Sequence, residues 1–122
     1  LLEARDLVVR YDGVEAVRGV SFAVGEGEVV GLIGPDGAGK TSSLRVLGGL
    51  LRSDGGSASA FGEDCWQSRR ALHTRLGYLA QRFALYGDLT VDENLNFYGR
   101  TYGVRGKRLR ARKAFVLEMA GV

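Results

Sequence analysis

G-P-D-G-A-G-K-T, Gly34 to Thr41, is the stretch that decides the fold of this 122-residue sequence. It matches the spacing G-x-x-x-x-G-K-[ST]. A short β-branched run, Glu28 to Ile33, precedes it and is typical of a buried central strand. Lys40 to Leu51 follows, with leucines at helical spacing. Strand, glycine-rich loop and helix in this order indicate a phosphate-binding P-loop in an α/β fold.

The residue types in this loop suit the phosphates of a nucleotide. Gly37 and Gly39 let backbone N–H groups approach the phosphates and allow unusual dihedral angles. The helix that starts near Lys40 adds its positive end, and the Lys40 ammonium reaches the β- and γ-phosphates. The Thr41 hydroxyl ligates Mg²⁺, and Ser42 is placed to touch the α-phosphate.

We therefore predict that the loop and the first helical turn bind the nucleotide. Taken alone, Asp36 is best interpreted as an ordinary loop residue, and Pro35 as a residue that stiffens the loop. The motif does not settle the class of protein, because kinases, GTPases, helicases and transport ATPases share it. The nucleotide-binding candidates are Gly34, Pro35, Asp36, Gly37, Ala38, Gly39, Lys40, Thr41 and Ser42.

Composition and charge exclude several other classes. Glycine contributes 19 residues, roughly twice the average usage of about 7%, with a single proline, so the chain is no Pro/Gly linker. The net charge of +3 comes from the segment 105–122, because residues 1–104 carry more acidic than basic side chains. A terminal basic run is usually a solvated face, so no nucleic-acid partner is expected. Cys65 and His73 are each alone, which indicates structural or surface roles.

The remaining pattern places strands early and helices late. Leu2 to Tyr11 and Val14 to Val24 predict a hairpin around the turn signal Asp12-Gly13. Three further segments are predicted as a short strand, a short helix and a second buried strand, in that order: Ser57 to Phe61, Trp66 to Thr74, and Leu76 to Ala80.

The last third reads as two helices. Thr90 and Glu93 have the spacing of a capping box. An apolar stripe follows on one helical face, ended by Gly103 and Gly106, and a last helix is predicted over Leu109 to Ala120. The stripe consists of Val91, Leu95, Tyr98 and Tyr102.

No signal peptide or membrane span is predicted. The start has no basic segment followed by an apolar stretch, and runs such as Val29 to Ile33 are far shorter than the roughly 18 residues of a spanning helix. With a lone cysteine, the expectation is a reducing, cytosolic environment.

Beyond the loop, the sequence resembles the ATP-binding subunits of ABC transporters. The resemblance is carried by V-S-F-A-V-G-E-G-E-V-V-G-L-I-G-P-D-G-A-G-K-T-S, Val20 to Ser42. It continues through Gly48 to Gly62 and through L-G-Y-L-A-Q-R-F-A-L-Y-G-D-L-T-V-D-E-N-L-N-F-Y-G, Leu76 to Gly99. The details look closest to the drug-export and ABC-2-type subunits. Departures include Asp36, where asparagine is usual, and Ser42, where threonine is usual.

The resemblance implies further roles. Tyr11 lies where the family stacks an aromatic ring on adenine, with an ordinary strand-end tyrosine as the alternative. Gln81 lies at the Q-loop glutamine, which meets Mg²⁺ and the attacking water, so Lys40 and Gln81 are the catalytic candidates. The loop residues Phe83, Leu85 and Tyr86 correspond to the contact with a membrane-spanning transporter subunit, with a buried core role as the alternative.

The resemblance also implies a fold and a division of the chain. The expected fold is a P-loop NTPase core with an N-terminal antiparallel β subdomain and the start of an α-helical subdomain. Residues 1–89 are expected to form the N-terminal part of the ATP-binding core, with the β subdomain, the P-loop and the Q-loop, and residues 90–122 to begin the helical subdomain before the signature motif. A Walker B aspartate, its adjacent glutamate, a switch histidine and the signature motif are not found in residues 82–122. We expect an N-terminal part of an ATPase that binds ATP and Mg²⁺ weakly and hydrolyses little by itself. In the intact protein a head-to-tail dimer at the inner membrane face would power export.

Three other functions stay open. One is an ABC-type ATPase without a membrane transporter, such as a translation or DNA-repair factor. Another is a different P-loop class, although the guanine-reading N-K-x-D pattern of GTPases is missing. The third is a nucleotide-binding module without catalysis.

Overall fold

The computed structural model describes residues 1–82 and 84–122, which form two compact units. The first unit is Leu1–Tyr78 and the second is Leu79–Val122. Each unit is described by itself. No helix among the described residues is both long enough and apolar enough to cross a membrane.

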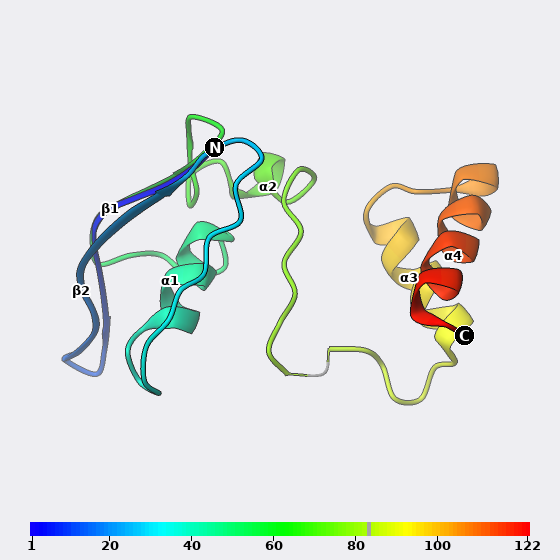
Figure 1. Cartoon of the computed structure of the whole chain (residues 1–122), viewed down its shortest axis with the longest axis horizontal. Helices are drawn as coiled ribbons and strands as arrows, with labels where there is room; N and C mark the ends of the chain where they lie inside the picture. Colours follow the sequence, from blue (N-terminus) through cyan, green and yellow to red (C-terminus); the bar gives the residue numbers. More distant parts are fainter. Residues whose placement is uncertain (83) are drawn as a thin grey trace. The chain divides into compact units, whose positions relative to one another are not determined.

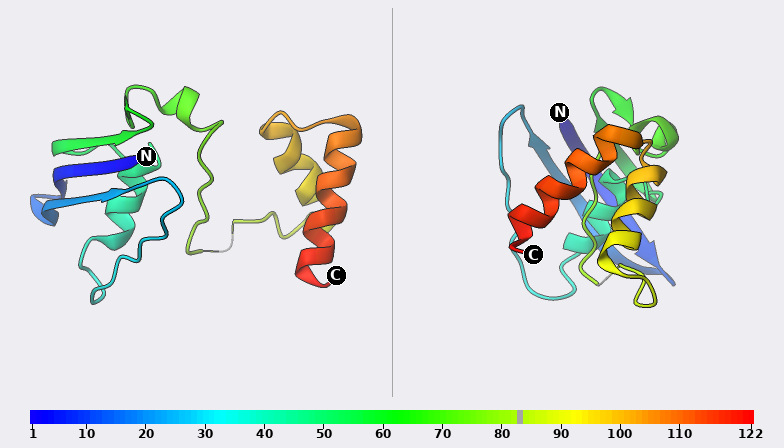
Figure 2. Two further views of the ribbon diagram at one scale, coloured as in Figure 1. Left: turned by 45° about the horizontal axis from the view of Figure 1, so that its top comes forward. Right: turned by 90° about the vertical axis from the view of Figure 1, so that its right-hand side faces the viewer.

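The first unit is built on an antiparallel sheet with strand order β2-β1-β3-β4. The hairpin of β1 (Leu2–Tyr11) and β2 (Val14–Val24) confirms the prediction residue for residue (Figures 1 and 2). Its two-residue turn places Asp12 and Gly13 at φ 48° and 79°, the left-handed conformations that such a tight turn needs. β3 (Gly55–Ala60) covers most of the predicted short strand, and β4 (Glu63–Asp64) pairs with it.

Helix α1 (Lys40–Leu47) packs against this sheet and contacts β1, β2 and β3 (Figure 2). It ends four residues before the predicted Leu51, because Gly48 caps it and Gly49 turns the chain with φ 67°. Helix α2 (Arg69–Leu72) is a shorter piece of the predicted 66–74 helix. The core between these elements consists of Ala4, Leu7, Val9, Val17, Val46, Leu47, Ala58, Ala60, Cys65 and Leu72.

Two strand predictions are wrong for the described structure. Glu28 to Ile33 forms no strand, and Val29 is 100% and Ile33 98% exposed. Leu76 to Ala80 is also outside the sheet, with Leu79 97% exposed. A central strand needs a hydrogen-bonded neighbour on each side, and the described residues offer these two segments none.

The second unit contains α3 (Val91–Thr101) and α4 (Gly106–Ala120). The predicted capping box is confirmed, since the Glu93 amide donates to Thr90 Oγ1 and the Thr90 amide donates to the Glu93 carboxylate. The Thr90 amide and the Thr90 hydroxyl both donate to the Glu93 carboxylate, and these two bonds lower the pKa of Glu93. Gly106 begins the last helix three residues before the predicted start, instead of ending the preceding one.

The apolar stripe of α3 is half-buried in its middle, at Leu95 and Tyr98, and exposed at both ends. Val91 and Tyr102 are more than half exposed, and the buried residue of the helix is Asn94. Helix α4 approaches α3 at Gly99, where Leu109 occupies the space that a side chain would need.

Cys65 is buried at 1% exposure in the core of the first unit, which confirms a structural role. Burial and the neighbouring Asp64 raise the pKa of its thiol to about 11. At pH 8 the reactive thiolate is therefore scarce, and the side chain is out of reach of reagents. We expect alkylation by iodoacetamide to be at least ~100-fold slower in buffer than in 8 M urea, measured by mass spectrometry. Equal rates in the two conditions would contradict this burial.

Candidate nucleotide-binding site

The glycine-rich loop leads from the segment 28–33, which lies outside the sheet, into α1. The Ala38 amide donates to the Pro35 carbonyl over 3.2 Å, which closes a turn whose third residue is Gly37. Gly37 has φ 81° and Gly39 has φ 88°, values that favour glycine over every other residue. The motif therefore needs glycine at these two positions for backbone reasons, before any ligand is considered.

The start of α1 leaves its first amides available to an anion. Gly39 is the N-cap and provides no capping side chain. The first N–H groups of a helix have no intrahelical partner, and they carry the positive end of the helix dipole. A phosphate is the ligand that such a terminus favours.

The Lys40 ammonium lies over the same loop. It donates to the Gly34 carbonyl over 2.5 Å and to the Pro35 carbonyl over 2.8 Å. A cation, uncapped amides and two positive-φ glycines thus gather at one loop, an arrangement suited to a polyphosphate. The exposed Thr41, one residue further, offers the hydroxyl oxygen that suits Mg²⁺.

Tyr11 reaches the site from the end of β1. Its phenol oxygen lies 3.1 Å from Ser42 Oγ, in hydrogen-bond contact, although the two residues are 31 positions apart in sequence. The ring is 43% exposed. The fold thus brings together the tyrosine and the loop residues that the sequence singled out separately.

Ser43 is a site residue that sequence reasoning missed. It is only 3% exposed, and its hydroxyl donates to the Gly39 carbonyl over 2.9 Å. This bond fixes the peptide at which the loop joins the helix. The motif gave no signal for it, because Ser43 lies two residues beyond the last fixed position.

Gly39 also lies tightly against the hairpin. A methyl group there would be 2.4 Å from the Ala16 carbonyl oxygen and 2.8 Å from Val17 Cγ2. We expect Gly39→Ala to lower the free energy of unfolding by about 2 kcal/mol, because clash and left-handed strain add, and to weaken ATP binding at least tenfold. Chemical denaturation and a nucleotide titration measure the two effects.

Gly37→Ala is the matched control for this substitution. Gly37 has a similar φ, but nothing lies within 4 Å of an added methyl group. Only the conformational strain of about 1 kcal/mol is expected there. If Gly37→Ala and Gly39→Ala lowered the free energy of unfolding equally, the contact of Gly39 with the hairpin would have no effect on stability.

The other predicted site residues belong to the second unit. Gln81 is exposed and lies outside any helix or strand, and its role stays a prediction. Leu85 and Tyr86 are about half exposed, at 47% and 51%. Phe83 lies outside the described residues.

Asn94 organises the loop that carries Tyr86. Its Nδ2 donates to the carbonyls of Tyr86, Leu89 and Thr90, and its Oδ1 accepts from the Tyr86 amide over 2.9 Å. The Tyr86 ring packs edge-on against Phe97, with centroids 5.1 Å apart. Sequence reasoning missed this asparagine, because a polar residue beside an apolar stripe gives no signal of burial.

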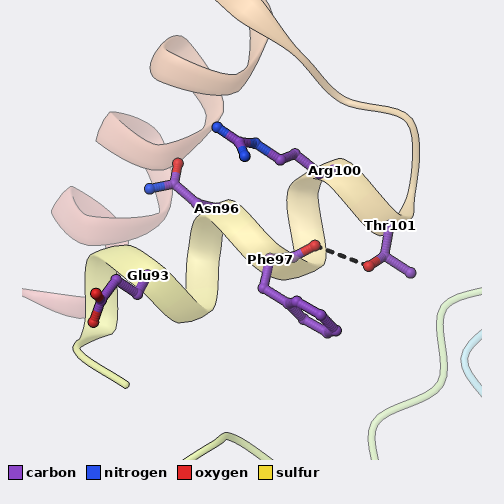
Figure 3. A pocket seen from close by; sticks show the side chains of 5 residues that line it. All are labelled: Glu93, Asn96, Phe97, Arg100 and Thr101. Atoms are coloured by element: carbon purple, nitrogen blue, oxygen red, sulfur yellow. Dashed lines mark hydrogen bonds between the residues drawn. The ribbon is translucent and has the colours of Figure 1, made fainter. Parts of the chain in front are cut away.

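A shallow groove follows one face of α3. It is lined by side chains of that helix alone, and the Thr101 hydroxyl donates to the Phe97 carbonyl within it (Figure 3). None of the predicted nucleotide-binding residues lines this groove. Its lining is Glu93, Asn96, Phe97, Arg100 and Thr101.

Comparison with known proteins places this geometry in a family. Residues 17–121 match the family model described as ABC transporter. The chain is 42% identical over 107 residues to the probable multidrug ABC transporter ATP-binding protein YbhF of Escherichia coli (strain K12), covering 88% of the chain and 18% of the relative. It is 40% identical over 117 residues to the daunorubicin resistance ATP-binding protein DrrA2 of Streptomyces coeruleorubidus, covering 96% of the chain and 36% of the relative.

The chain thus spans less than two fifths of the length of these relatives. Among solved structures, it resembles the dimeric ATP-binding cassette MJ0796 bound to ADP and Pi, with a TM-score of 0.86 at 22% identity, covering 100% of the chain and 58% of that cassette. This likeness confirms the predicted fold, a P-loop NTPase core with its antiparallel β subdomain. Because the family model matches residues 17–121, which is most of the chain, the chain belongs to the ABC transporter family.

Proposed function

We propose that the chain binds ATP together with Mg²⁺ and that, in the intact protein, hydrolysis of this ATP drives export by an ABC transporter. The observation that carries the proposal is the loop before α1, where two positive-φ glycines, uncapped helix amides and the Lys40 ammonium gather. The relatives described above, a probable multidrug ABC transporter ATP-binding protein and a daunorubicin resistance ATP-binding protein, support export.

Each side chain has one task in this proposal. Lys40 leaves the two loop carbonyls and pairs with the β- and γ-phosphates, because a polyanion is a stronger partner than neutral carbonyls. Thr41 offers its hydroxyl to Mg²⁺, which when bound neutralises phosphate charge. The Tyr11 ring stacks on adenine, and the Gln81 amide orients the attacking water.

The proposal includes partners and a place in the cell. The loop at Leu85 and Tyr86, with Phe83, contacts a membrane-spanning subunit, so the protein is cytoplasmic and peripheral on the inner membrane face. A second ATP-binding domain completes the site in a head-to-tail dimer; the MJ0796 cassette is itself described as dimeric. Residues 1–89 belong to the ATP-binding core, and residues 90–122 begin the helical subdomain.

A nucleotide titration of the whole chain tests the binding step. We expect saturable binding of a fluorescent ATP analogue with Mg²⁺, a weaker affinity in EDTA, and displacement by unlabelled ATP. Phosphate release by the chain alone should stay near background. No saturable binding at millimolar nucleotide would contradict the proposal, and robust turnover would contradict the need for further catalytic residues.

A further inference from the structure

We infer that Tyr11 is a positioning residue for phosphate binding, acting through the hydroxyl of Ser42. The inference rests on the proposed ATP binding and adds a role that adenine stacking does not require. Its basis is the contact between the Tyr11 phenol oxygen and Ser42 Oγ, 3.1 Å apart.

The contact joins two elements that the loop separates. Tyr11 is the last residue of β1 and pairs with Val14 across the hairpin turn, so its backbone is fixed by the sheet. Ser42 is the third residue of α1, in the turn whose amides face the loop. The hydrogen bond therefore ties the first turn of α1 to a strand that is already held in place.

Ser42 is the serine of this turn that is open to a ligand. The neighbouring Ser43 is buried and donates its hydroxyl proton to the Gly39 carbonyl. Ser42 is partly exposed, and its hydroxyl contacts Tyr11. An incoming anion can therefore recruit the Ser42 proton without breaking the bond that joins loop and helix.

The number of protons on Ser42 then determines which group donates in each of the two hydrogen bonds, the one to the phosphate and the one to Tyr11. A serine hydroxyl has one proton and two lone pairs. A fully ionised phosphate oxygen only accepts, so Ser42 must give its proton to the phosphate. Tyr11 must then donate to Ser42 Oγ, because Ser42 has no second proton. A hydroxyl that accepts one bond is a stronger donor in the next, so Tyr11 strengthens the phosphate contact from the far side of the serine.

Tyr11→Phe separates this role from stacking, because phenylalanine keeps the aromatic ring and removes the hydroxyl. We expect a three- to tenfold loss of affinity for ATP with Mg²⁺, the range for one hydrogen bond of ordinary strength. The same loss of affinity is expected for inorganic tripolyphosphate with Mg²⁺, because tripolyphosphate has no base that could stack on the ring. Isothermal titration of the whole chain measures both.

Combining substitutions at Tyr11 and Ser42 tests whether the two hydroxyls act together. In a Ser42→Ala background, Tyr11→Phe should have no further effect, because its only route to the phosphate is gone. Ser42→Thr keeps a hydroxyl and should keep the sensitivity to Tyr11→Phe. Tyr102→Phe, an exposed tyrosine at the end of α3, should leave the affinity of either ligand unchanged. Unchanged melting temperatures show that the variants fold.

Three results would overturn the inference while leaving the proposed function intact. They are wild-type affinity in Tyr11→Phe, a loss confined to ATP, and an undiminished loss in the Ser42→Ala background. Failure of the unmodified chain to bind either ligand would instead overturn the proposed function, and the inference with it.

Discussion

Replacing Lys40 with alanine is expected to weaken the binding of ATP by at least about 100-fold. Lys40 is the cation held over the loop, by the Gly34 and Pro35 carbonyls. Loss of charge-assisted hydrogen bonds to a phosphate costs about 1.5–3 kcal/mol each, and a hundredfold change in affinity corresponds to roughly 2.7 kcal/mol. Isothermal titration with ATP and Mg²⁺ measures the change.

The fold should tolerate Lys40→Ala, because the two carbonyls that lose the ammonium belong to exposed loop residues and regain water. The free energy of unfolding should therefore change by less than about 0.5 kcal/mol. Lys40→Arg keeps the charge but presents a rigid fork in place of a compact ammonium, so an intermediate loss of affinity is expected.

Lys107→Ala is the matched control for charge. Lys107 is exposed in the first turn of α4, and its removal changes the net charge by the same amount. The affinity of this variant for ATP should stay within twofold of that of the unmodified chain, since Lys107 is outside the phosphate loop and exposed charges are screened by salt. If Lys40→Ala weakened ATP binding less than threefold, or if Lys40→Ala and Lys107→Ala weakened it equally, Lys40 would not contact the phosphates.

Local physical rules explain which elements could be predicted. The hairpin of β1 and β2 needs only its own alternating residues and a turn that Asp12 and Gly13 can form. The capping box of α3 needs only Thr90 and Glu93, three residues apart. The phosphate loop is equally local, because its glycines are required by the backbone of the loop itself.

The predictions that failed depend on partners distant in sequence. Glu28 to Ile33 has the composition of a central strand, but a strand exists only where neighbours complete its hydrogen bonds. The hydrogen bond between Tyr11 and Ser42 joins residues 31 positions apart, and no periodicity in the sequence predicts it. The exposed Val91 shows the same limit for helices, because the packed face of α3 is set by α4 and by the loop before it.

Asn94→Leu is expected to lower the stability of the second unit by about 3–4 kcal/mol. The side chain is 4% exposed and makes four hydrogen bonds with the backbone of residues 86–90. Each such bond contributes about 1 kcal/mol, and leucine fills a similar volume without replacing any of them. Hydrogen exchange at the Tyr86 amide should rise to the rate of an unprotected peptide, because its acceptor is gone. Denaturant unfolding followed by far-UV circular dichroism measures the stability.

Two further variants separate the hydrogen bonds from simple packing. Asn94→Asp keeps the shape of the side chain and the acceptor for the Tyr86 amide. It places a carboxylate oxygen, which cannot donate, against the three carbonyls that accept from Nδ2 in the unmodified chain. It should therefore destabilise about as much as leucine does. Asn96 lies two residues along the same helix, is partly exposed, and forms hydrogen bonds with Asp92 and Lys113. Asn96→Leu removes these bonds and should lower the free energy of unfolding by about 1 kcal/mol or less.

The comparison also tests how the loop at Tyr86 is held. If Asn94→Leu and Asn96→Leu lose the same stability, then burial of the asparagine adds nothing and the loop is held by the packing of Tyr86 on Phe97. If Asn94→Leu exposes the Tyr86 amide to exchange and Asn96→Leu does not, the polar side chain of Asn94 sets the conformation of that loop. In that case the surface proposed to meet a membrane subunit is shaped from inside, by one amide buried beneath an exposed aromatic ring.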